Sequence, residues 1–103
     1  MANKLPTKLQ EKLEELLGSK NVYYQPPESV KMQYPAIRYT KSEIENNFAN
    51  NARYSSFTVY DVTVIDRKPD NEVIQKILNL PYSSFDRHYV SDNLNHDVII
   101  LYF

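Results

Sequence analysis

The C-terminal part of the chain holds the residue types best suited to metal binding or acid–base chemistry. Two histidines and three aspartates gather between positions 86 and 97: Asp86, His88, Asp92, His96 and Asp97. Imidazole and carboxylate groups together bind Zn²⁺, or act as a general base and the group that orients it. This cluster is therefore the first candidate for a chemical site.

The spacing within the predicted strands argues against convergence of these groups. Alternate residues of a strand point to opposite faces, so His96 and Asp97 point apart, whereas Asp86 and His88 share a face. In a tight hairpin around Ser91–Leu94, His88 and His96 are predicted to lie opposite each other. A polar pair on the solvent face explains this arrangement, because a site needs several converging groups. We therefore predict no catalytic residues and no metal ligands.

The rest of the chain has few groups for other kinds of catalysis. It contains no Cys and one glycine, Gly18, so it lacks a thiol nucleophile and a glycine-rich loop for phosphates or dinucleotides. Neighbouring carboxylates at Glu14–Glu15 fall on a predicted helix surface, where charges are normally solvated. The sequence thus predicts no cofactor and no enzymatic activity. A metal-dependent hydrolase built on His88 and His96 is the last of the alternatives.

Length and charge limit the class of protein further. A chain of 103 residues is long enough for one domain, which we predict to span residues 1–103. Its 12 basic and 13 acidic side chains nearly balance, so no basic cluster indicates direct nucleic-acid binding. No stretch approaches the ~18 apolar residues that cross a bilayer. A soluble protein with no membrane partner is expected.

Apolar spacing predicts two helices. Leucines at positions 5, 9, 13, 16 and 17 form one helical stripe that ends at Gly18, the residue expected in a left-handed C-cap. A second stripe follows Asp70 or Asn71 as N-cap and ends before Pro81. Its members are Val73, Ile74, Ile77, Leu78 and Leu80.

Strands are predicted at residues 21–25, 34–40 and 56–66, with two more in the C-terminal hairpin. Residues 56–66 are apolar and β-branched on both faces, which is typical of a central strand. Residues 41–53 contain four Asn in six positions, a turn-forming composition that predicts a long polar loop. The fold class is therefore α+β, in the order α-β-β-β-α-β-β. A mostly antiparallel sheet of about five strands is expected to carry both helices on one face.

The order of these features resembles the tail-terminator and tail-completion proteins of long-tailed bacteriophages, a family of neck and minor structural proteins. An amphipathic N-terminal helix ends at Gly18 and leads into the first strand. The segments that carry the resemblance after this helix are Val22–Pro27, Tyr34–Tyr39, Tyr60–Asp66, Phe85–Tyr89 and Asp92–Asp97. The resemblance covers essentially the whole chain.

This resemblance implies a structural protein of the virion, assembled in the cytoplasm of the host bacterium. Members of the family form a six-fold ring that caps the tail tube, stops its growth and contacts the head connector. The expected partners are therefore further copies of this chain and other tail or neck proteins. Two different surfaces of each subunit would meet in such a ring.

We place one of these surfaces on the predicted loop 41–53. Phe48 would be the apolar anchor, and Glu43, Glu45 and Arg53 would set the register. The alternative is a surface loop with no partner. Two other functions stay open: a head-side connector or minor capsid component, and a small module that binds a peptide or ligand in an apolar pocket on its sheet face.

Overall fold

A single mixed sheet of five strands, in the order β1-β2-β3-β5-β4, organises the chain. The computed structural model describes residues 6–49 and 52–103, with side chains described in these ranges except at 44–57. The elements are α1 (Thr7–Leu17), β1 (Val22–Tyr24), β2 (Ala36–Ala49), β3 (Ala52–Asp66), α2 (Val73–Leu78), β4 (Ser83–Ser91) and β5 (Leu94–Tyr102). The predicted α+β class and order of elements are confirmed. One pair, β1 with β2, is parallel, and the other three are antiparallel.

α1 follows its predicted apolar stripe and its predicted stop. Leu9 and Leu13 are buried, while Leu16 and Leu17 pack at the margin of the core. Gly18 adopts φ 79° and donates its backbone N–H to Glu14 O, which satisfies a carbonyl of the last turn. The stripe predicted from Leu5 onward is confirmed for the residues that the structure describes.

α2 is shorter than its apolar stripe suggests, because it ends at Leu78. Asn71 helps to start it: Asn71 Oδ1 accepts a hydrogen bond from the Val73 N–H at 2.9 Å, and Asn71 Nδ2 donates to Asp66 Oδ2 at 2.7 Å. The side chain thus ties the first turn of α2 to the end of β3. Ile74 and Ile77 then turn toward the sheet and are buried.

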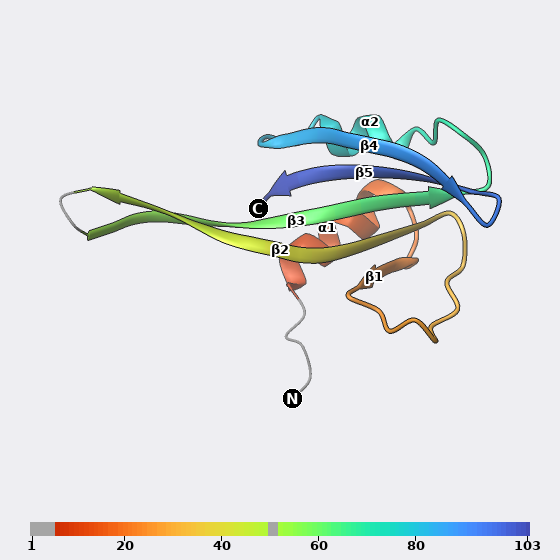
Figure 1. Ribbon diagram of the computed structural model, residues 1–103, viewed down its shortest axis with the longest axis horizontal. Helices are drawn as coiled ribbons and strands as arrows, with labels where there is room; N and C mark the ends of the chain where they lie inside the picture. The colour runs from red at the N-terminus through yellow and green to blue at the C-terminus, as the bar shows by residue number, and fades with distance from the viewer. Residues whose placement is uncertain (1–5, 50–51) are drawn as a thin grey trace.

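Both helices lie on the same face of the sheet, as predicted (Figure 1). The fully buried side chains between them and the strands include Leu9, Leu13, Ile37, Tyr39, Val62, Val64, Ile77, Ile99 and Leu101. β3 is central, and its opposite face is also largely covered, since Val59, Thr63 and Ile65 are buried there. This agrees with the prediction of a strand that is apolar on both faces.

A polar contact inside this core fastens α1 to two strands. The Tyr39 hydroxyl donates to Gln10 Oε1 at 2.6 Å, and Gln10 Nε2 donates to Val22 O at 3.0 Å. The Tyr39 ring packs against Tyr24 and Tyr60, with centroid distances of 4.8 and 5.9 Å. Burial raises the pKa of the Tyr39 phenol above its usual range, and the neighbouring Tyr60 and Tyr24 hydroxyls add to the effect. Gln10 therefore satisfies a buried hydroxyl and positions the helix.

The prediction of a loop at 41–53 is wrong, because β2 and β3 continue as a long hairpin. Their pairing runs on to Ala49 with Ala52, with register shifts after Lys41 and after Asn47. β3 pairs with β5 only from Val59 onward, and β2 pairs with β1 only at residues 37–39. Residues 45–49 and 52–57, here called the arm, therefore pair only with each other among the described strands. The Asn-rich composition indicated a turn, but cross-strand pairing extends the flanking strands through most of it.

The arm dominates the shape of the molecule. At ~3.3 Å per residue it extends roughly 20 Å beyond the part of the sheet that the helices cover. The overall dimensions are 50 × 32 × 23 Å, with the arm along the longest axis (Figure 1). Neither of the two helices within the described ranges is long and apolar enough to span a membrane.

We expect Tyr39→Phe to lower the free energy of unfolding by about 1–2 kcal/mol, because it removes a buried hydrogen bond and leaves Gln10 Oε1 without its donor. Urea unfolding followed by circular dichroism measures the change. Tyr24→Phe is the matched control, since the Tyr24 hydroxyl forms no hydrogen bond with the described residues while its ring joins the same cluster. Equal losses in both variants would show that the Gln10 contact contributes nothing.

Candidate functional site

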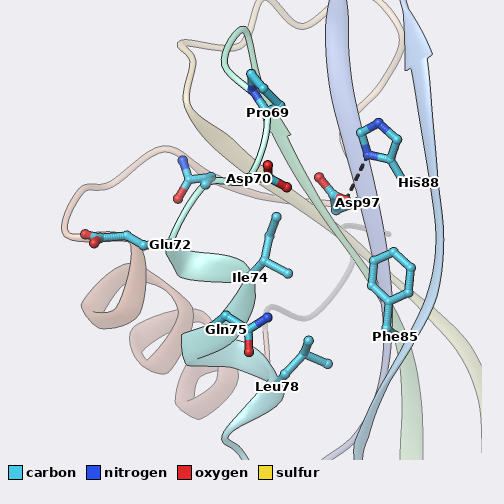
Figure 2. Close-up of a pocket in the computed structure, with 10 residues that line it drawn as sticks. Pro69, Asp70, Glu72, Ile74, Gln75, Leu78, Phe85, His88 and Asp97 are labelled. Carbon is cyan, nitrogen blue, oxygen red and sulfur yellow. Dashed lines mark hydrogen bonds and ion pairs between the residues drawn. The ribbon is translucent and has the colours of Figure 1, made fainter.

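A groove lies between α2 and β4 and is here called the α2–β4 groove (Figure 2). Its volume is about 570 Å³. Ile74, Gln75 and Leu78 of α2 form one wall, Phe85 and His88 of β4 form the other, and Asp97 of β5 lies at the floor. The segment Pro69–Glu72 closes the end at which α2 begins. The groove therefore has an apolar centre and polar groups at one end.

His88 and Asp97 form the one polar pair within this groove. His88 Nδ1 lies 2.9 Å from Asp97 Oδ1; the Asp97 side chain is 12% exposed and that of His88 is 42% exposed. In the tautomer that carries its proton on Nδ1, the imidazole donates to the carboxylate and Nε2 remains an acceptor. The pair can thus hold a hydrogen-bond donor or a cation from a ligand.

The predicted pairing of His88 with His96 is wrong by one residue. His88 lies opposite Asp97 in the register, and His96 lies opposite Tyr89. Neighbouring positions on a strand face opposite sides, so His88 faces α2 while His96 faces away from the helices. There the His96 ring stacks on Tyr89 at a centroid distance of 4.6 Å, and its Nδ1 lies 3.0 Å from Leu94 O. The two imidazoles cannot share a metal ion from opposite faces of the sheet.

The groove lacks the groups that would turn its His–Asp pair into a nucleophilic catalytic set. No Ser, Thr, Cys, Lys or Tyr lines it, so His88 has no side-chain nucleophile to activate. Among the described residues, no group of three or more His, Cys, Asp or Glu side chains could hold a metal ion. The arrangement is suited to binding an apolar group beside a hydrogen-bond donor or a cation.

A smaller hollow lies on the opposite face of the sheet. It has a volume of about 340 Å³ and is lined in part by Arg38, Arg87 and Tyr89, which surround the largely buried Thr63 and Val98. The Arg87 guanidinium pairs with Asp86 and lies 5.9 Å from the centroid of the Tyr89 ring. These long side chains cover a sheet face that has no helix on it.

The residues predicted to form a subunit interface lie on the arm or at its base. Glu43 is exposed at the base and pairs with Val59. Glu45 pairs with Phe57, and Phe48 pairs directly with Arg53, so the hairpin brings together two residues predicted to act jointly. The side chains of Glu45, Phe48 and Arg53 lie outside the described part of the structure.

In sequence, the chain matches no protein-family model and no curated protein.

The sequence alone does not predict the apolar wall of the α2–β4 groove. The sequence places Phe85 in a hairpin strand and gives no further role to it. In the structure this strand is an edge strand beside α2, and the Phe85 side chain is 49% exposed. Its partners, Ile74 and Leu78, were correctly placed on the apolar stripe of a helix. The usable signal was a large aromatic residue in a strand that is otherwise polar up to Tyr89.

We expect Zn²⁺ to leave the thermal unfolding midpoint unchanged, because His88 and His96 face opposite sides of the sheet. A metal bound to the native state stabilises it in proportion to its affinity and concentration. Thermal unfolding with and without excess Zn²⁺, each repeated with His96→Ala, provides the measurement. A rise in the midpoint that His96→Ala abolishes would contradict this geometry.

Proposed function

We propose that this protein is a structural subunit of a tailed bacteriophage or prophage particle, a tail terminator or completion protein that assembles as a ring at the head–tail junction. The arm is the observation that carries the proposal. An isolated two-stranded ribbon is marginally stable in water, and an arm of this length has both strand edges open within the described structure. An element of this kind gains stability when it packs against another subunit.

Two further observations support a structural role over an enzymatic one. The His–Asp pair of the α2–β4 groove has no side-chain nucleophile beside it, and the balanced charge offers no extended basic surface for nucleic acid. The resemblance in the order of sequence features supplies the location, namely the neck of a long-tailed phage. A head-side connector or minor capsid component would use the same kinds of surface.

A second function, a small ligand- or peptide-binding module, is favoured by the α2–β4 groove itself. Its volume of about 570 Å³ lies within the range of small-molecule sites, and it combines apolar walls with the His88–Asp97 pair. Such a module would be a stable monomer and would need no arm. The arm therefore favours the structural role.

Deletion of this gene from its phage or prophage tests the role directly. We expect electron microscopy to show overlong tails, or tails and filled heads that fail to join, because an absent terminator neither stops the tube nor completes its end. Supply of the gene in trans is the control and should restore normal particles. Normal infectious virions from the deletion would remove the structural role and leave the binding module.

We expect the joint substitution Phe48→Ser and Arg53→Glu to abolish self-assembly while the subunit stays folded. The two positions pair across the arm, so the change removes an apolar anchor and reverses a charge at one place. Native mass spectrometry measures assembly, and circular dichroism checks folding. Asn46→Ser with Ser55→Thr is the matched control on the same arm. Assembly unchanged by the first pair would rule out this surface.

A further inference from the structure

The apolar part of the α2–β4 groove is open to solvent. Phe85 is 49% exposed and faces Leu78 and Ile74 across the groove (Figure 2). β4 is also an edge strand, and exposed apolar side chains recur along it, with Tyr82 just before its start at 70% and Val90 near its end at 62%. A large exposed aromatic side chain in a groove is suited to contact with a partner.

The charges around the groove select for a cation. Three carboxylates line it, from Asp70, Glu72 and Asp97, and no Lys or Arg does. Lys76 reaches Glu72 at 3.7 Å from outside the groove, and His88 lies 2.9 Å from Asp97, so the Asp70 carboxylate is the one best placed to face an occupant. A suitable occupant presents an apolar group next to a positive charge.

The tip of the arm has this composition. Between Asn46 and Phe57 the sequence contains no Asp or Glu, and its single charged residue is Arg53. The register pairs Arg53 with Phe48, which places a cation and a large aromatic residue at the same level of the hairpin. The tip and the groove are thus complementary in charge and in polarity.

The arm cannot reach the groove of its own subunit. It extends from one end of the sheet, whereas the Pro69–Glu72 segment that closes the groove follows the opposite end of β3 (Figure 1). We propose that the α2–β4 groove receives the arm tip of a second copy of this chain. The apolar residues of the tip pack against Ile74, Leu78 and Phe85, and Arg53 faces Asp70. This inference rests on the proposed ring function and names the second of its two surfaces.

A contact between two different surfaces is heterologous, so each subunit both gives an arm and receives one. Repetition of the contact produces a closed ring when the rotation between neighbours closes, and a filament when it does not. A disulfide across this contact therefore links many subunits in series. A disulfide across the contact of a symmetric dimer links only two.

Cysteine pairing tests this directly, since the natural chain contains no Cys. Ala49→Cys at the arm tip combined with Gln75→Cys in the groove wall should give a ladder of disulfide-linked multimers after oxidation. Each single variant should give dimers at most. Ala49→Cys with Lys8→Cys, an exposed position on α1 away from the groove, is the matched control and should give no ladder. Circular dichroism confirms that all variants are folded.

Exchange of the charges at Arg53 and Asp70 tests whether these two residues meet in the contact. In the cross-linking pair, Arg53→Glu should lower the linked fraction roughly tenfold or more, because it places like charges together. Asp70→Arg in the same chain should restore the ladder. Absence of a ladder, or no recovery in the exchanged variant, overturns the inference. Two further experiments separate failure of this contact from failure of the proposed function. If native mass spectrometry shows that the unmodified chain forms a ring but the cysteine variant gives no ladder, the groove is not the acceptor of the arm. If the phage deletion gives normal virions, the proposed function itself is rejected.

Discussion

The structure depends on the burial of one face of the sheet beneath α1 and α2. Leu13 and Ile77 are both fully buried where the helices cover the strands, and the Tyr39–Gln10 hydrogen bond holds α1 in register with β1 and β2. Two helices are enough to cover only the middle of this sheet. The arm beyond β1 and β5 stays uncovered, and the short α2 leaves a groove against β4. The surfaces available for contacts are therefore consequences of how far the helices reach.

These two surfaces lie on different parts of the subunit and differ in character. The arm is an elongated ribbon with one positive charge near its tip, and the groove is a concave surface with apolar walls and carboxylates at one end. In the proposed ring, a contact between two such unlike surfaces would join the subunits head to tail.

The C-terminal hairpin shows how strongly register decides chemistry. Asp92 and Asn93 both have positive φ, 55° and 62°, which forms a two-residue turn that pairs Ser91 with Leu94. This turn sets His88 opposite Asp97, whereas a turn one residue different would have paired it with His96. Because side chains alternate between faces, that single residue separates a histidine pair from a His–Asp pair in a groove. Sequence spacing alone did not distinguish the two.

Local signals in the sequence determined the parts of this protein that local physics controls. The leucine stripe and Gly18 predicted α1, and the β-branched run at 56–66 predicted the central strand. The N-cap expected at Asp70 or Asn71 predicted the start of α2 approximately, since the N-cap residue is Glu72. The tertiary structure decided the rest: the parallel pairing of β1 with β2, the extension of both strands through 41–53, the face on which each histidine lies, and the groove at Phe85. These features depend on which distant segments pair, and pairing is set by packing and backbone hydrogen bonds between residues far apart in the chain. The Asn-rich composition of residues 41–53 indicates that a turn can form there. The pairing of β2 with β3 determines how far the strands extend into this segment before the chain turns.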